Sequence, residues 1–229
     1  MHHHILACLL LSPLAVLATA ATPDPATKPD GVASPDGRLV VDFHLTDAGA
    51  PRYAIRLAGR PVLAESQLGL VRDDADFSWG LALIGASEMA PVRDQYEILT
   101  VKRRLNTYRA NRREFHLQTP AGRRLDVIFQ VSDDGVAFRY RFPETDATVH
   151  RLRAEESSFH FLPGTRAWLQ PIAVAKQGWS LASPSYEEYY QKDIPVGTPS
   201  PTGAGWVYPA LFRTGLRRDE VSGRAHRPG

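Results

Sequence analysis

The feature that most constrains the fold is the stretch Leu125–Phe142, which reads LDVIFQVSDDGVAFRYRF. Large apolar side chains recur at every second position on both sides of a short turn, Asp133-Asp134-Gly135. A period of two places such side chains on one face of a strand. Two runs of this kind joined by a glycine-containing turn predict a β-hairpin. Each strand offers several large apolar groups to one face, so we expect a second sheet to cover it.

The rest of the chain repeats this pattern in shorter form. Candidate strands are separated by turn residues, and they lie at 39–45, 52–57, 67–71, 96–105, 106–118, 151–153, 157–162 and 206–214. A loop is predicted around Met89-Ala90-Pro91. We find no convincing apolar stripe with the 3.6-residue period of a helix. The sequence therefore predicts an all-β sandwich of antiparallel strands with few or no helices.

The first 20 residues have the outline of a secretory signal peptide. Ile5–Leu17 is a mostly apolar run, and Ala18-Thr19-Ala20 resembles a cleavage site. Residues 21–33 are predicted to form a flexible linker, because their composition cannot build a core. No later apolar run is long enough to span a bilayer. We therefore expect an exported protein, periplasmic or extracellular, with no membrane attachment after signal cleavage.

Charge argues against a nucleic-acid partner. The formal net charge is +2 at pH 7, and positive and negative residues are interspersed. Basic residues gather at 102–104 and 109–113. Strand-like alternation around them indicates a solvated face of a sheet rather than a nucleic-acid surface.

The residues alone indicate no enzyme. The histidines show no metal-binding spacing, and no GxSxG motif is present. Glycoside hydrolysis needs two carboxyl groups that flank one bond, but adjacent residues on a strand point to opposite faces. Asp133 and Asp134 are predicted to be turn residues. Asp73, Asp74 and Asp76 lack the glycine and distal glutamate of a calcium loop, which favours a solvated loop.

A long segment after residue 163 is rich in Pro, Gly, Ser, Trp and Tyr, and a loop of this length is often functional. It contains aromatic and carboxylate side chains at Trp168, Trp179, Tyr186, Glu187, Tyr189, Tyr190, Trp206 and Tyr208. Aromatic faces bind sugar rings, but they also fill cores. Both interpretations stay open, and Trp206 and Tyr208 are the candidate substrate-binding residues.

Several segments resemble the N-terminal domain of glycoside hydrolase family 97, which contains exported bacterial α-glucosidases and α-galactosidases. They are SPDGRLVVDFHL, QLGL, VIFQVSDDGVAFRYRFPE, GWSLASPSYEEYY and GWVYPALFRT. The resemblance places this domain at residues 34–214. It implies an antiparallel β-super-sandwich, galactose-mutarotase-like, that packs against a (β/α)₈ barrel. In the family, the barrel carries the catalytic residues.

The resemblance also implies a calcium site. The family's calcium is held mostly by barrel glutamates, with one glutamate from the N-terminal domain. Glu187 matches that position, and Glu188 is the alternative if the register shifts by one residue. Calcium takes six to eight oxygen ligands. We therefore expect these 229 residues alone to bind calcium weakly or not at all.

The resemblance leaves three functions open. The first is a non-catalytic domain that binds carbohydrate (an α-glucoside or α-galactoside), supports the barrel and contributes one calcium ligand. The second is a free-standing carbohydrate-binding module, and the third is a subunit that docks a separate barrel. Residues 215–229 contain several arginines and no strand pattern. We expect them to be a disordered, non-native tail of a truncated or frame-shifted product, which the downstream nucleotide sequence would test.

Overall fold

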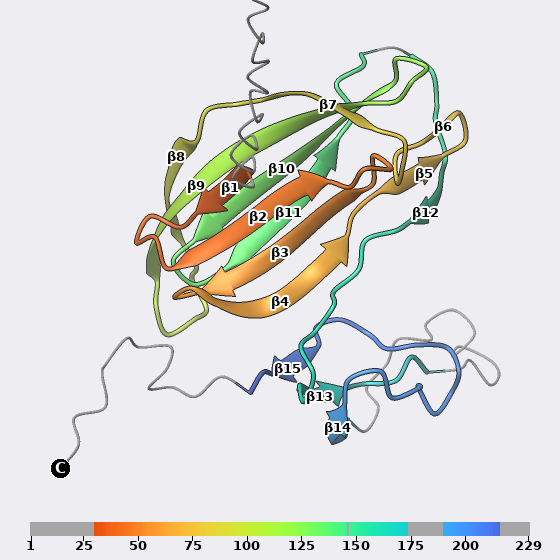
Figure 1. Ribbon diagram of the computed structural model, residues 1–229. Coiled ribbons are helices and arrows are strands. Elements are labelled where there is room, and N and C mark those ends of the chain that lie inside the picture. The colour runs from red at the N-terminus through yellow and green to blue at the C-terminus, as the bar shows by residue number, and fades with distance from the viewer. Residues whose placement is uncertain (1–29, 146, 174–189, 216–229) are drawn as a thin grey trace, which may run out of the picture.

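The computed structural model describes residues 30–145, 147–173 and 190–215 (Figure 1). Every element in these ranges is a β-strand, and all the pairings are antiparallel. The predicted all-β class is therefore confirmed. No helix in the described ranges has the length and hydropathy needed to cross a bilayer.

The first sheet is built from consecutive strands. They are β1 (Asp30–Ala33), β2 (Leu39–Leu45), β3 (Pro51–Leu57) and β4 (Arg60–Gln67), in that order across the sheet. Alternation along β2 and β3 buries Phe43 and Tyr53 on the inner face. On the other face, Arg56 donates two hydrogen bonds to the Asp42 carboxylate at 2.7 and 2.8 Å. The sheet thus has one apolar and one polar face, as expected for an antiparallel sheet in a sandwich.

The second sheet contains the predicted hairpin. Its strands are β7 (Ala82–Ala86), β8 (Ala90–Glu97), β9 (Leu105–Gln118), β10 (Arg124–Ser132) and β11 (Val136–Arg141). The order is β11-β10-β9, and β7 and β8 pair with different parts of the long β9. β10 and β11 pair in register around Phe129 and Phe138. Residues 133–135 form the turn, closed by a hydrogen bond from Ser132 N to Gly135 O at 2.9 Å. The hairpin prediction is confirmed.

The core lies between these two sheets. Leu125, Val127, Phe129 and Val131 of β10 are fully buried and face the first sheet. Aromatic rings fill the centre of the core: the Phe43 and Phe115 ring centroids are 4.4 Å apart, and those of Tyr53 and Phe129 are 6.0 Å apart. The first sheet is therefore the cover that the hairpin's apolar face requires.

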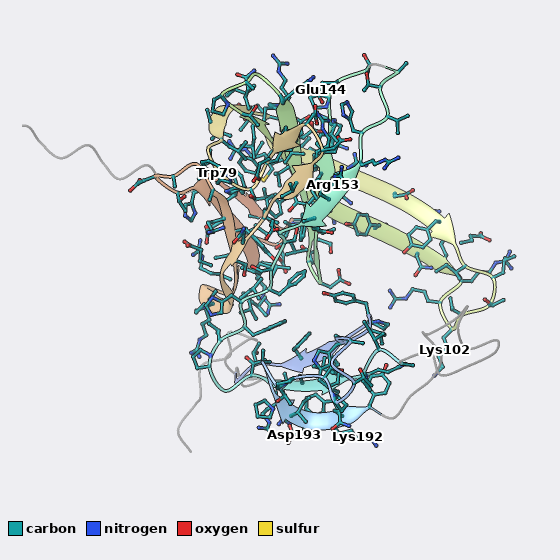
Figure 2. All side chains as sticks on the ribbon, turned by 90° about the vertical axis from the view of Figure 1, so that its right-hand side faces the viewer. Trp79, Lys102, Glu144, Arg153, Lys192 and Asp193 are labelled. Carbon is teal, nitrogen blue, oxygen red and sulfur yellow. The ribbon has the colours of Figure 1, made fainter. Side chains whose placement is uncertain are left out.

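Two smaller sheets complete the described structure. One contains β5 (Leu70–Arg72), β6 (Ala75–Asp76) and β12 (Leu152–Glu155), in the order β12-β5-β6. The other, here called the small sheet, contains β13 (Arg166–Leu169), β14 (Gln191–Pro195) and β15 (Leu211–Arg213), in the order β14-β13-β15. The small sheet lies beyond one end of the sandwich (Figures 1 and 2). Asp193 of β14 connects all three strands of the small sheet, because its carboxylate pairs with Arg166 of β13 and Arg213 of β15.

Several local predictions were wrong. The end of the predicted flexible linker, Asp30–Ala33, forms β1 and buries Val32 completely, and the predicted strand at 157–162 forms only an isolated bridge at Phe161. The loop predicted at Met89-Ala90-Pro91 is the start of β8, an edge strand, where the missing N–H of proline is tolerated. Residues 96–105 do not form one extended strand, because the chain turns between β8 and β9 and Ile98 N donates to Arg104 O at 2.8 Å. Of the predicted strand at 206–214, only β15 forms.

Candidate functional site

The segment after β12 joins the sandwich to the small sheet. It runs beside the free edge of β4, where Ser158 N donates to Gln67 O at 2.9 Å and Ala64 N donates to His160 O at 2.9 Å. Leu63 and Phe161 form an isolated antiparallel bridge. These contacts pair the edge of the first sheet and hold residues 157–161 in place.

This segment and the chain leading into β15 enclose a cleft of about 490 Å³, here called the aromatic cleft. Its lining residues are Ser157, Ser158, Phe159, Phe161, Tyr208, Ala210 and Phe212. Phe161 and Phe212 stack with ring centroids 3.9 Å apart. Phe159 and Tyr208 are 47% and 80% exposed, so their rings remain available to a ligand. Apolar clefts of this size with a few polar groups are typical of small-molecule sites.

Two serine hydroxyls supply polar groups to the aromatic cleft. Ser157 Oγ lies 2.7 Å from Tyr140 Oη, which accepts a hydrogen bond from Gly69 N at 2.8 Å. Ser158 Oγ accepts a hydrogen bond from Gln67 N at 2.8 Å, which leaves its own proton to donate. Burial raises the pKa of Tyr140, so its hydroxyl stays protonated at neutral pH. None of the lining residues is charged, and the cleft therefore suits a neutral ligand.

The two candidate substrate-binding residues lie in different surroundings. Tyr208 is on the wall of the aromatic cleft. Trp206 is half-buried beside Pro171, and its indole Nε1 donates to Thr198 O at 3.3 Å. The structure therefore brings only Tyr208 to the cleft. Its aromatic neighbours there are three phenylalanines that the sequence analysis did not select, because they come from segments about fifty residues apart.

The predicted metal ligand Glu187 and its alternative Glu188 lie outside the described residues, as do Trp179, Tyr186 and Tyr189. Two other members of the predicted aromatic group are described. The Trp168 ring is half-buried in the small sheet, and the Arg213 guanidinium lies 5.2 Å from its centroid. Tyr190 is 43% exposed and directly precedes β14.

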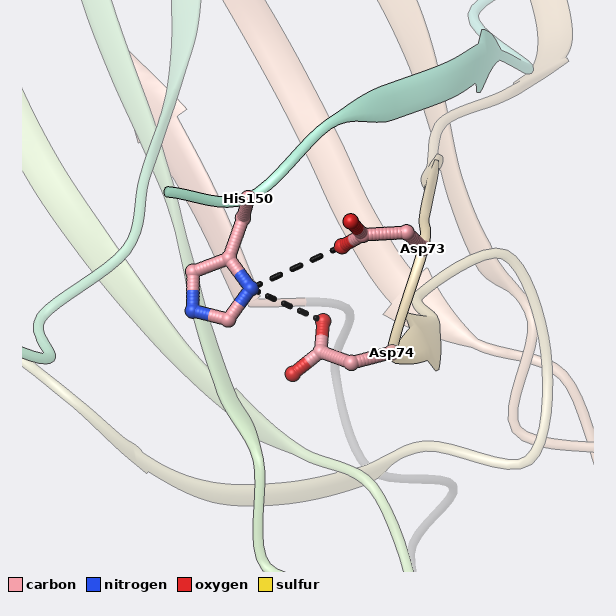
Figure 3. A group of neighbouring side chains, drawn as sticks. All are labelled: Asp73, Asp74 and His150. Carbon is pink, nitrogen blue, oxygen red and sulfur yellow. Dashed lines mark ion pairs between the residues drawn. The ribbon is translucent and has the colours of Figure 1, made fainter. Parts of the chain in front are cut away.

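Asp73, Asp74 and His150 form a group that could hold a cation. His150 Nδ1 lies 3.5 Å from one oxygen of each aspartate (Figure 3). However, Asp74 already pairs with two guanidinium groups, those of Arg72 at 2.5 Å and Arg123 at 3.3 Å. Positive charges beside a carboxylate oppose the binding of a metal ion. The group is therefore better described as an ion-pair network.

Arg72 is the centre of this network. Its side chain is 2% exposed, and its guanidinium lies 4.6 Å from the Phe142 ring centroid. Glu144 Oε2 lies 3.6 Å from Arg72 Nη1 and has no hydrogen-bond partner among the described residues. The hydrogen bond from Arg72 is the largest influence on the pKa of Asp74 and holds it below its usual value. The loop predicted to be merely solvated thus contributes a charge partner to a buried arginine.

Among the described residues, the side chain of Asp76, at the end of β6, hydrogen-bonds only within its own turn. It accepts hydrogen bonds from Ser78 N at 2.8 Å, from Ser78 Oγ at 2.6 Å and from Trp79 Nε1 at 2.9 Å. Burial raises the pKa of Asp76, but these hydrogen bonds outweigh that effect and lower it overall. Asp76 therefore shapes the turn and does not face His150.

A second group lies in one row across the outer face of the second sheet. His116 Nδ1 lies 2.7 Å from Asp126 Oδ1, and Arg141 pairs with Asp126 at 2.7 Å and with Glu114 at 2.5 Å. The strand register places His116, Asp126 and Arg141 side by side on three neighbouring strands. Arg141 pairs with both carboxylates, and Arg112 lies 3.8 Å from Glu114, so this group is a cross-strand charge network.

The fold is similar to parts of solved glycosidases. A structure of a β-arabinopyranosidase matches 81% of this chain at 34% identity and a TM-score of 0.75. A glycoside hydrolase family 97 enzyme from Pseudoalteromonas sp. strain K8, solved in complex with panose, matches 62% of the chain at 23% identity and a TM-score of 0.57. The second similarity is one of fold alone.

The family itself follows from the sequence. The family model described as Glycosyl-hydrolase 97 N-terminal matches residues 32–218. The chain therefore belongs to glycoside hydrolase family 97 through its N-terminal domain. A probable retaining alpha-galactosidase from Streptomyces bingchenggensis (strain BCW-1) is 33% identical over 152 residues, which are 61% of this chain. The chain spans 23% of that relative and 30% and 22% of the two solved enzymes.

Proposed function

We propose that the chain acts as the non-catalytic N-terminal domain of an exported α-glycosidase and supports a (β/α)₈ catalytic barrel. The observation that carries this proposal is the family match over 32–218, taken with relatives more than three times as long as the matched part. The N-terminal apolar run and small-residue site support export to the periplasm or beyond.

The proposed contribution to a metal site is one carboxylate. Glu187, or Glu188 if the register shifts, would supply one oxygen donor to a calcium ion, and the barrel would supply the others. A carboxylate is a ligand that calcium prefers, but one residue provides too few oxygens. In this arrangement calcium would link the domain to the barrel.

Carbohydrate is the second proposed partner. The aromatic cleft supports this, because it combines the exposed Tyr208 ring with serine hydroxyls and carries no charge. An aromatic face packs against the apolar face of a sugar, and hydroxyl groups fix its orientation. Trp206 would act indirectly, by holding the loop that leads to Tyr208.

Two alternatives have some support. A free-standing carbohydrate-binding module would use the same exposed Tyr208. A subunit that docks a separate barrel would use exposed apolar side chains at the turn between β8 and β9, such as Leu99 at 77% exposure. Binding of the purified chain on a glycan array favours the first alternative, and co-purification with a barrel protein favours the second.

The calcium contribution is tested by calorimetric titration of the purified chain. We expect weak binding or none, because one carboxylate cannot satisfy the ion. Micromolar affinity for calcium would contradict the proposal. The same preparation should not hydrolyse a nitrophenyl α-galactoside, and turnover that persists after repurification would overturn the non-catalytic role.

A further inference from the structure

A second hollow lies beside the turn of the β10–β11 hairpin. It has a volume of about 390 Å³ and lies between the β8–β9 ribbon and the β10–β11 turn. The ribbon extends away from the sandwich, with Lys102 at its end (Figure 2). The residues that matter for its chemistry are Tyr96, Arg103, Tyr108, Arg109, Asp133 and Asp134. We call this hollow the turn groove.

The two carboxylates of the turn groove are held in place and keep spare acceptor capacity. Asp133 Oδ1 accepts a hydrogen bond from Asp36 N at 2.9 Å. Asp134 Oδ1 accepts one from Ser132 Oγ at 2.7 Å. The second oxygen of each carboxylate has no hydrogen-bond partner among the described residues. The turn therefore offers two oriented acceptors to the groove.

Donors line the opposite side. Within the described part of the chain, the guanidinium groups of Arg103 and Arg109 make no hydrogen bond or ion pair. The Asn106 side chain donates to Arg103 O at 3.1 Å and so fixes the backbone that carries the first of them. Tyr108 Oη accepts a hydrogen bond from Gln130 Nε2 at 3.0 Å, which leaves the phenol proton to donate.

We propose that the turn groove binds a neutral saccharide. Two arginines and two aspartates balance in charge, so neither an anion nor a cation is favoured overall. A sugar hydroxyl both donates and accepts, and it can bridge acceptors and donors that do not reach each other. Tyr96, which is 45% exposed, offers an aromatic face to the apolar side of the ring. This site is separate from the aromatic cleft and goes beyond the proposed role in supporting a barrel.

The proposal is tested by titrating the full chain with neutral saccharides (galactose, arabinose and panose) and observing binding by NMR chemical shifts. We expect millimolar or tighter binding of at least one of them. Arg109→Gln and Tyr96→Ala should each weaken it about tenfold, because each removes a principal contact. Arg139→Gln on β11 is the matched arginine control and should stay within about twofold of the parent chain. Binding to the turn groove is read from the signals of its own lining residues, such as Tyr108 and Asp134, so that binding in the aromatic cleft does not interfere.

Thermal unfolding of each variant checks that the fold is intact. Absence of binding by all three sugars would overturn the proposal, as would tighter binding of galacturonate than of galactose. Loss of binding in Tyr208→Ala with Arg109→Gln unaffected would also overturn it, because the sugar would then occupy the aromatic cleft. None of these results depends on a barrel or on calcium, so failure here is distinguishable from failure of the proposed function.

Discussion

Arg72 shows how one buried charge is accommodated in this fold. Its guanidinium packs against both the Phe77 and Phe142 rings, 5.3 and 4.6 Å from their centroids. Burial lowers the pKa of Arg72, but its hydrogen bonds to Asp74 and the negative charges of Asp74 and Glu144 outweigh this effect and raise it. A buried charge is tolerated only when it is paired and hydrogen-bonded. Asp74 is therefore a structural residue.

Asp74→Asn should destabilise the protein by about 1–3 kcal/mol at pH 7, because it removes a charged partner from Arg72. Asp73→Asn is the matched control, since Asp73 pairs with His150 at 3.5 Å and not with Arg72. Urea unfolding followed by fluorescence measures both variants. A cost for Asp73→Asn as large as that for Asp74→Asn would contradict this account.

Asp74 also makes the stability of the protein depend on pH in the acid range. The pKa of Asp74 is lowered in the folded state, chiefly by the hydrogen bond from Arg72. Its contribution to stability is therefore present above the unfolded pKa of about 3.9 and is lost as pH falls through the lower folded value. The stability difference between the parent chain and Asp74→Asn should shrink below about pH 4. A stability difference that stays constant down to pH 2 would show that Asp74 does not act through its charge.

Among the elements, the β10–β11 hairpin contributes most to the core. Phe129 has no exposed surface, and its ring neighbours include Phe43, Tyr53 and Phe138. Phe129→Ala should cost about 3–5 kcal/mol, because it leaves a cavity between the sheets. Phe159→Ala, at a ring 47% exposed, should cost less than about 1 kcal/mol. Chemical denaturation of both variants measures the two losses of stability. Equal losses would show that Phe129 is not central to the core.

The hairpin was predictable because its signal is local. Period-two alternation and a glycine turn occur within eighteen residues, from Leu125 to Phe142. The start of β8 was not predictable, because it depends on pairing between Pro91 and Asn111, across a turn that the sequence does not mark. An edge strand tolerates proline, so the residue that suggested a loop was compatible with a strand.

At the scale of the whole molecule, the predictable part was the class of fold and the family. The candidate sites were harder to predict from the sequence, because residues from distant segments form them. The aromatic cleft joins Phe159 to Phe212, and the turn groove joins Tyr96 to Asp134. Turn signals alone identified Asp133 and Asp134 as turn residues, and that is where they lie. Their proposed role in the turn groove depends also on Arg109 of β9 and on Arg103, which lies in the turn between β8 and β9.

The whole molecule also presents unpaired apolar surface. Leu99, Val101 and Leu105 near the end of the β8–β9 ribbon are at least half exposed, as is Leu211 in the small sheet. Both regions lie toward the same end of the sandwich (Figures 1 and 2). A surface of this kind is typical of an interface with another protein or domain. It is consistent with the proposed role as one domain of a longer glycosidase.

A domain exchange tests the central claim most directly. Residues 32–215 of this chain would replace the matching part of the β-arabinopyranosidase relative, and hydrolysis of nitrophenyl β-arabinopyranoside would be measured. We expect a soluble, active chimera whose activity is lost in Glu187→Ala and kept in Glu188→Ala, or the reverse if the register shifts, because we propose that one of these carboxylates binds calcium. A folded chimera without activity, or activity unchanged by both substitutions, would contradict the account.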